Sequence, residues 1–216
     1  MKQRERVREI FKRWQEVNPH PRTELHYRND FELLCAVILS AQSTDKVVNL
    51  VTPQLFQLAP TPEKMSQLTL EDITACINRL GLHQAKATYL LSMSQSLVSD
   101  FNGQVPNTRE ALESLAGVGR KTANVVLNTA FSAAVIAVDT HIFRVAKRLG
   151  FSKGKTPRAV EEDLMRIVPK SYLKDAHHWM ILHGRYTCQA KKPKCQVCII
   201  NDQCPSSTEH ASVHCK

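Results

Sequence analysis

The sequence of 216 residues lacks any apolar run long enough to cross a membrane. Residues 1–24 lack the apolar core of a secretory signal, so nothing in them points to export. No sustained alternation of apolar and polar residues predicts a β-sheet, and neither an internal repeat nor a low-complexity segment is present. These absences argue against membrane and exported proteins, and we expect a cytoplasmic protein with no membrane partner.

Acidic residues are missing from two long stretches. None lies between Glu113 and Asp139, and none lies between Asp175 and Asp202. Over the whole chain 29 Lys and Arg outnumber 20 Asp and Glu, which gives a formal charge of +9. This balance suits a polyanionic partner, chiefly nucleic acid. Charge alone is equally compatible with a basic protein that has no such partner.

Apolar residues recur at helical spacing almost throughout. One such stripe predicts an amphipathic helix from Phe31, Leu34, Cys35 and Ile38. Only 133–138 (AAVIAV) reads equally as a short strand or a buried connector. We expect helices to begin after Ser43 or Thr44, Thr61, Thr69, Asn107 or Thr108, Gly119, Asp139 and Thr156. We expect helix stops or kinks at Pro53, Gly81, Gly103 and Gly150. The sequence therefore predicts an all-α protein.

Residues 114–124 read SLAGVGRKTAN, which places a glycine turn directly before a helix. Backbone N–H groups exposed at Gly117, Val118 and Gly119 would form an anion site at that helix N-terminus. Contacts through amides carry no base information, so the expected partner is the DNA backbone. An ordinary helical hairpin with a tight turn is the competing interpretation, and the glycines alone favour it.

Two cations follow the turn, at the helix end where acids are usually preferred. Lys121 lies beside Arg120 in positive potential, which favours the neutral amine, and a neutral lysine can form a Schiff base. Most single lysines are merely solvated. Asp139, at the start of a later helix, offers a carboxylate partner, although most such residues are only helix caps.

Four cysteines crowd near the C-terminus, at Cys188, Cys195, Cys198 and Cys204, with the spacing C-x6-C-x2-C-x5-C. Four thiolates can hold a structural zinc ion or a [4Fe–4S] cluster, and the spacing leaves the two close to even. Disulfides are disfavoured in a reducing compartment.

The basic segment QAKKPK joins the first two of these cysteines. Pinned at both ends, it would present Lys191, Lys192 and Lys194 to phosphates. The other cysteines lack ligand spacing: we expect Cys35 and Cys76 to pack in helices and Cys215 to lie in a loose tail over 206–216.

The chain resembles the endonuclease III family, whose members are DNA glycosylases with lyase activity against oxidised pyrimidines. The resemblance covers nearly the whole chain. It is carried by LLCAVILSAQSTD (33–45), INRLGLHQAKA (77–87), LAGVGRKTANVVL (115–127), VDTHIFRVAKRLG (138–150), HGRYTC (183–188) and the cysteine spacing. One departure is Ala116, where the family's hairpin usually has proline; it would soften the turn without removing amide donors.

The resemblance implies a role for each matching residue. Lys121 would be the nucleophile on the sugar C1′ and Asp139 its carboxylate partner. Gln42 and Leu82 would enter the DNA where the damaged nucleotide is extruded. The four cysteines would hold a [4Fe–4S] cluster, with zinc the less favoured occupant. The partner would be double-stranded DNA carrying damaged bases or abasic sites, bound by a monomer associated with a bacterial nucleoid.

The resemblance also implies two helical domains with the active-site cleft between them. We expect a central domain over 23–133 that contains the helix–hairpin–helix, and a cluster domain formed by 1–22 and 134–205. The N-terminal helix would then return to pack with the C-terminal half.

Three other functions fit part of the sequence. An adenine-removing relative would lack the lysine at 121 and would carry a Glu in the helix over 33–40, where this chain has no acid. A non-enzymatic DNA-binding module would need neither Lys121 nor Asp139. An iron–sulfur electron carrier would not need a hairpin that docks on DNA.

Overall fold

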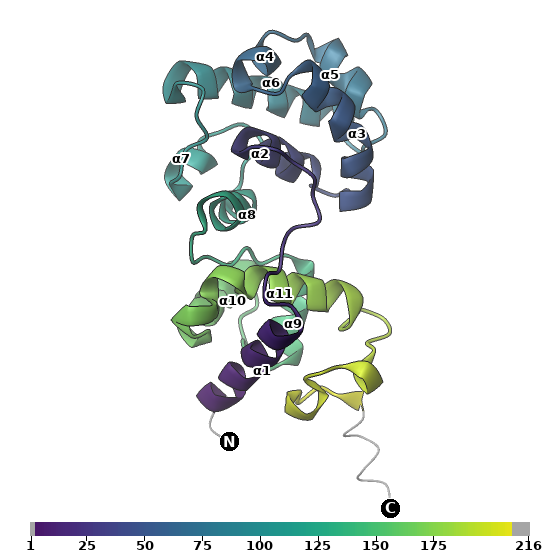
Figure 1. Ribbon diagram of the computed structural model, residues 1–216, viewed down its shortest axis with the longest axis vertical. Helices are drawn as coiled ribbons and strands as arrows, with labels where there is room; N and C mark the ends of the chain where they lie inside the picture. Colours follow the sequence, from purple (N-terminus) through teal and green to yellow (C-terminus); the bar gives the residue numbers. More distant parts are fainter. Residues whose placement is uncertain (1–2, 209–216) are drawn as a thin grey trace, which may run out of the picture. The chain divides into compact units, whose positions relative to one another are not determined.

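The computed structural model describes residues 3–208 (Figure 1). Within this range every regular element is a helix, which confirms the all-α prediction. The ambiguous segment over 133–138 forms no strand. It is an irregular connector in which Ile136, Ala137 and Val138 are buried.

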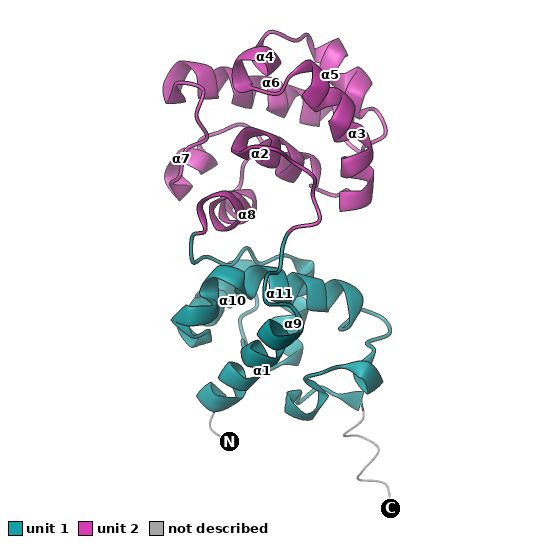
Figure 2. Cartoon of the chain, viewed as in Figure 1, with its two compact units in different colours: residues 1–22, 133–216 teal, residues 23–132 magenta. Residues whose placement is uncertain are grey.

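The chain divides into two compact units (Figure 2). Unit 2 comprises 23–132, and unit 1 comprises 1–22 together with 133–216. The domain limits expected from the sequence end the central domain at residue 133, one residue later than unit 2 ends. The assignment of these parts as a hairpin domain and a cluster domain stays a prediction.

Unit 2 is arranged around one short helix, α2 (Asp30–Leu39), which is buried from its second residue onward. Its neighbours are α3, α6 and α8, and α6 in turn packs against α4 and α5, while α7 packs against α8. The bounds of these helices are α3 Asp45–Leu58, α4 Pro62–Ser66, α5 Leu70–Ile77, α6 His83–Phe101, α7 Arg109–Glu113 and α8 Arg120–Phe131.

The expectation of an amphipathic α2 is wrong, because every residue from Phe31 to Leu39 is buried. Helices contact it on several sides and leave no face for solvent. The one acid in that run, Glu32, is buried against Arg28 of the preceding loop. Its carboxylate accepts from the Arg28 backbone N–H at 2.7 Å and from the Arg28 Nη2 at 2.6 Å, so its charge is paired.

Unit 1 combines the N-terminal helix with the C-terminal part of the chain. Its elements are α1 Gln3–Val17, α9 Thr140–Arg148, α10 Pro157–Ile167, η1 Lys170–Tyr172, α11 Leu173–Tyr186, η2 Cys195–Val197 and η3 Asn201–Gln203. Helix α11 packs against both α9 and α1. The α1 side chain of Arg13 forms an ion pair with Asp202 at 2.5 Å, so the N-terminal helix packs on the cysteine-rich segment, as expected.

An aromatic cluster joins the two parts of unit 1. The ring of Phe11 is fully buried and lies 5.0 Å from the ring of Trp14, 5.8 Å from Tyr172 and 6.2 Å from both Phe151 and Trp179, measured between centroids. These rings come from α1 and from segments more than a hundred residues later. The cluster therefore fixes where α1 packs.

Capping side chains begin most helices where the sequence predicted. Thr44, Thr61, Thr108, Asp139 and Thr156 each accept a bond from a backbone N–H in the first turn. Thr69 and Asp72 form the predicted capping box. The helix ends at Gly103 and Gly150 are also confirmed, and both glycines have positive φ.

One predicted boundary is wrong and another is decided in part. At Pro53 the sequence predicts a stop or a kink, and helix α3 does not stop there: it continues to Leu58, because burial of Leu55 and Phe56 beyond the proline outweighs the one backbone hydrogen bond that proline cannot make. Helix α5 ends at Ile77, and Gly81 lies four residues later with no positive φ. In the described part of the chain no helix is both long and apolar enough to cross a membrane.

The predicted loose tail begins within the described residues. Ser207 is buried, its N–H donates to the Cys204 carbonyl, and its hydroxyl bonds to the Asn201 side chain. The chain is therefore packed as far as Ser207. Cys215 and the rest of 209–216 lie outside the described residues.

Replacing Phe11 by alanine tests the aromatic cluster. The Phe11→Ala variant is expected to lose about 3–5 kcal/mol of unfolding free energy, because it removes a fully buried ring and leaves a cavity. Urea unfolding followed by circular dichroism measures the loss. Val17→Ala on the same helix is the control, since Val17 is 69% exposed. Equal stability of the two variants would contradict the assignment.

Candidate functional site

The hairpin between α7 and α8 turns at Gly117, which adopts φ +77°. A Cβ at this position would lie 2.8 Å from the Cβ of Tyr89 on α6. Glycine is therefore required both for the backbone conformation and for the close approach to α6. The turn is closed by the N–H of Val118, which donates to the Leu115 carbonyl at 3.1 Å. Val118 is buried and its amide is engaged inside the turn, so this one of the three amides expected to bind an anion is already bonded.

Gly119 is the N-cap of α8, yet neither its backbone conformation nor its packing requires a glycine at this position. Its φ is −96°, which any residue adopts, and a Cβ there would meet no atom within 4 Å. The first backbone bond of α8 is from the Ala123 N–H to the Gly119 carbonyl. The N–H groups of Lys121 and Thr122 thus lie in the first turn, ahead of the helical bonding pattern.

The start of α8 is chemically unlike that of most helices in the chain. No side chain caps it, and no acid lies in its first turn. Instead Arg120 is half-buried and Lys121 is exposed there. Arg109 of α7 donates to the buried Asn124 side chain at 3.0 Å, which fixes this end of α8 against α7. A helix N-terminus with cations in place of a cap is an anion-binding arrangement.

Gln42 and Leu82 share an unusual backbone conformation. Both are non-glycine residues with left-handed φ, +54° for Gln42 and +58° for Leu82, and both side chains are exposed. Leu82 is 61% exposed and precedes α6 without capping it. Such residues cost free energy that the surrounding structure must supply, and they gather at functional sites.

Asp139 is held at the start of α9. Its Oδ1 accepts from the Ile142 N–H at 2.7 Å, and the residue is half-buried. The buried connector that ends at Val138 leads directly into it. Lys121 belongs to unit 2 and Asp139 to unit 1. The cleft expected between the two units stays a prediction.

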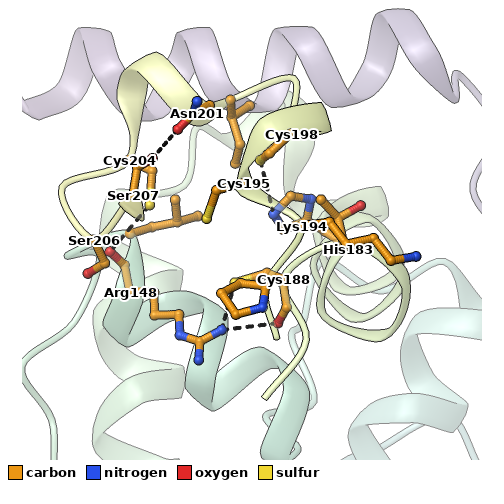
Figure 3. A pocket seen from close by; sticks show the side chains of 14 residues that line it. Arg148, His183, Cys188, Lys194, Cys195, Cys198, Asn201, Cys204, Ser206 and Ser207 are labelled. Carbon is orange, nitrogen blue, oxygen red and sulfur yellow. Dashed lines mark hydrogen bonds between the residues drawn. The ribbon is translucent and has the colours of Figure 1, made fainter. Parts of the chain in front are cut away.

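The four cysteines after α11 line a single cavity (Figure 3). They are Cys188, Cys195, Cys198 and Cys204, each half-buried and each a free thiol. Among the described residues no three His, Cys, Asp or Glu side chains are arranged to hold one metal ion. All four cysteines instead line one cavity, which Ile200 also lines. A multi-iron cluster has the size and the need for soft ligands that this arrangement meets.

Positive groups and burial shape the chemistry of the thiols. Burial raises the pKa of Cys198 to about 11 and also raises the pKa of Cys204, so their thiolates need a bound cation. Arg148 donates to the Cys188 sulfur at 3.3 Å and to the Gln189 carbonyl at 2.7 Å. The residues present therefore fit an iron–sulfur cluster.

A histidine lies against one of the four cysteines. His183 Nε2 is 3.9 Å from the Cys198 sulfur, and burial lowers the pKa of His183 to about 4, which keeps the ring neutral. Sequence reasoning missed both His183 and Arg148. Arg144 and Arg148 lie one turn apart on α9, which could have marked a shared face, but their partners near Cys188 are some forty residues away in the sequence.

The predicted basic loop between the first two cysteines is closed by backbone bonds. The Thr187 carbonyl accepts from the Lys194 N–H at 2.9 Å and from the Gln189 N–H at 3.0 Å. Lys191, Lys192 and Lys194 are exposed, as a phosphate-binding loop requires. Of the other cysteines, Cys35 and Cys76 are buried in α2 and α5, as predicted.

Two family models match the chain. Residues 35–170 match the HhH-GPD superfamily of base excision DNA repair proteins, and 188–204 match the iron–sulfur binding domain of endonuclease III. Endonuclease III of Haemophilus influenzae is 56% identical, over 91% of this chain and 93% of the relative. The chain belongs to the endonuclease III family. The Escherichia coli K12 member is 53% identical over the same shares of both chains.

Solved structures agree with this membership. A trapped endonuclease III–DNA covalent intermediate matches with a TM-score of 0.90 at 41% identity, covering 98% of this chain and 100% of that chain. A non-covalent endonuclease III–DNA complex gives the same values. A thermostable thymine-DNA glycosylase, at 23% identity and a TM-score of 0.84, shares the fold. Because residues 188–204 match the iron–sulfur binding domain of endonuclease III, the cysteine-rich segment is an iron–sulfur binding domain. This family match, rather than the cysteine spacing, decides between a cluster and zinc.

Replacing one thiol tests the ligand set. Cys198→Ala is expected to lose bound iron and acid-labile sulfide, because a cluster loses one of its four thiolates. Iron and sulfide measured per chain provide the readout. Cys76→Ala, a buried thiol outside the cavity, should keep both. Unchanged iron in Cys198→Ala, or zinc without sulfide in the unaltered protein, would overturn the assignment.

Proposed function

We propose that this chain removes oxidised pyrimidines from double-stranded DNA and then cleaves the abasic site, with Lys121 as the nucleophile. As a member of the endonuclease III family it is a base excision repair enzyme, a DNA glycosylase and abasic-site lyase. One relative has been captured as a covalent intermediate with DNA. The observation that carries the residue assignment is the exposed lysine in the uncapped first turn of α8.

DNA binding begins at the phosphates. The first-turn amides of Lys121 and Thr122, with the positive end of α8, suit one backbone phosphate. Gly119 leaves open space that a phosphate can approach closely. The exposed lysines between Cys188 and Cys195 supply a second basic surface. A bound cluster would hold this loop through Cys188 and Cys195, and side chains would do the chemistry at the base.

A damaged base must leave the duplex before it can be attacked. Extrusion costs a few kcal/mol of lost stacking and pairing, and damage reduces this cost. The exposed Leu82 can enter the stack as an apolar wedge. The exposed Gln42 carries an amide that can pair with the base left unpartnered. Both side chains belong to unit 2, as does Lys121.

The Lys121 amine then attacks the sugar. A bond forms from Nζ to C1′ as the bond from C1′ to the base breaks, and the base departs with a proton. Loss of the amine proton and opening of the sugar ring give an imine. Removal of a C2′ proton lets the C3′–O bond break, and the strand is cleaved with the 3′ phosphate as leaving group.

Asp139 is proposed to stabilise the positive charge that develops on the sugar and to assist proton transfer. Its cap bond engages Oδ1, which fixes the carboxylate while Oδ2 serves the reaction. The protein is proposed to act as a monomer in the cytoplasm, associated with the bacterial nucleoid. An adenine-removing activity is disfavoured by Lys121 itself and because Glu32, an acid of α2, is bound to Arg28.

Replacing Lys121 tests the nucleophile. Lys121→Gln is expected to lower nicking of an abasic-site duplex on the order of a thousandfold or more, because the amine that forms the imine is absent. Borohydride should trap the unaltered protein on damaged DNA and fail to trap this variant. Lys64→Gln, at an exposed lysine of α4, is the matched control. Covalent trapping of Lys121→Gln would rule out the assignment.

A panel of duplexes tests the substrate class. Base release and strand nicking are measured on duplexes that carry oxidised pyrimidines, oxidised purines or adenine mispairs. Release of oxidised pyrimidines with nicking supports the proposal. Release of adenine alone would support the adenine-removing alternative, and binding without either product would support a non-enzymatic module.

The two glycines of the hairpin should respond differently to alanine. Gly117→Ala is expected to destabilise the protein by at least about 1 kcal/mol, because of its positive φ and the contact with Tyr89. Gly119→Ala should keep full stability and lose affinity for an abasic-site duplex by about tenfold, because its Cβ would obstruct the phosphate. Thermal melting and fluorescence anisotropy measure the two effects. Full DNA affinity in Gly119→Ala would refute the phosphate site.

A further inference from the structure

The two loops proposed to enter DNA are each held in a costly conformation. Gln42 and Leu82 both have left-handed φ without being glycine, and both are exposed. A residue in this state persists only where its neighbours hold it. Local contacts supply part of the support. Beside Gln42, the Ser43 N–H donates to the Ser40 carbonyl; beside Leu82, the His83 ring contacts the Leu80 carbonyl at 3.2 Å.

One side chain connects the two loops. Lys86, in the first turns of α6, is only 3% exposed. Its Nζ donates to the Ser43 hydroxyl at 2.9 Å, directly after Gln42. Its backbone N–H donates to the Leu82 carbonyl at 3.0 Å. Lys86 therefore bonds to Ser43, the neighbour of Gln42, through its side chain, and to Leu82 through its backbone.

A buried ammonium is a costly means of holding two loops together. Burial disfavours the charged form and lowers the pKa of Lys86. The next buried positions along α6, Ala87 and Leu90, are apolar, and Lys86 is the one lysine among the buried residues of this unit that the structure describes. An apolar residue at 86 would avoid the cost of burying charge but would lose the bond to Ser43. The bond is therefore the property that distinguishes lysine here.

We infer that Lys86 is a positioning residue that holds the Gln42 and Leu82 loops together in the conformation that enters DNA. This inference rests on the proposed function of the two loops. Lys86 is buried and acts through Ser43 and the α6 backbone. If the loops relax, the competent state becomes a smaller fraction of the population, and steps that need insertion slow by that fraction.

The test compares a reaction that needs insertion with one that does not. Base release from a damaged duplex requires the stack to be opened, whereas nicking of an abasic site in a single strand does not. Lys86→Met is expected to slow base release under single-turnover conditions by about tenfold and to change single-strand nicking by less than about twofold. Lys64→Met, an exposed lysine of the same unit, is the charge-matched control.

A double-mutant cycle tests the bond itself. Ser43→Ala should slow base release about as much as Lys86→Met, and the double variant should be no slower than either. Ser43→Thr, which keeps the hydroxyl, should behave as the unaltered protein. A 2-aminopurine placed opposite the lesion should brighten on binding in the unaltered protein and less so in Lys86→Met.

The outcomes separate this inference from the proposed function. Equal loss of base release and of single-strand nicking in Lys86→Met would show a merely structural lysine and overturn the inference. Additive effects of Lys86→Met and Ser43→Ala, or no effect of either, would also overturn it. If the unaltered protein neither released a base nor nicked an abasic site, the proposed function would fail instead.

Discussion

The close approach of Gly117 to Tyr89 is the constraint on which the hairpin depends. Because a Cβ would lie 2.8 Å from the Tyr89 Cβ, the turn can pack against α6 only with glycine there. That packing sets where α8 begins, and the first turn of α8 carries Lys121. The nucleophile proposed for the reaction is thus placed by a backbone contact rather than by its own side chain. Its amine remains exposed, as attack on a sugar requires.

The same division between support and chemistry recurs in both units. In unit 2 the residues proposed to enter DNA are exposed and left-handed, while Lys86 beneath them is buried and bonded. In unit 1 helix α9 begins at Asp139 and carries Arg148, whose guanidinium bonds the segment that starts with Cys188. In the proposed function, exposed groups reach DNA while the buried Lys86 and the half-buried Arg148 bond the segments beside them, at a desolvation cost that each bond offsets.

Much of the fold followed from local chemistry. Capping residues such as Thr61, Thr108 and Asp139 marked helix starts, because orphan N–H groups need an acceptor close in sequence. Tertiary packing decided what local chemistry did not. Helix α3 continues through Pro53 instead of stopping there, and α2 is buried from Phe31 to Leu39, because neighbouring helices decide which faces of a helix contact water. Lys121, Asp139 and the four cysteines were proposed from local sequence patterns and from the resemblance to a family, whereas neither Lys86 nor His183 was singled out.

The sequence by itself determined the helical class, most helix starts, the family and the candidate chemistry at Lys121, Asp139 and the four cysteines. Each of these depends on residues close together in the sequence: capping residues, cysteine spacings or short motifs. Only the tertiary structure decided that the Val118 amide is already bonded, that Gly119 has open space, and that Lys86 bonds Ser43. The physical reason is that the Lys86–Ser43 bond joins residues 43 positions apart and the space around Gly119 depends on how distant segments pack, while the Val118 bond depends on the conformation that the turn adopts in the folded chain.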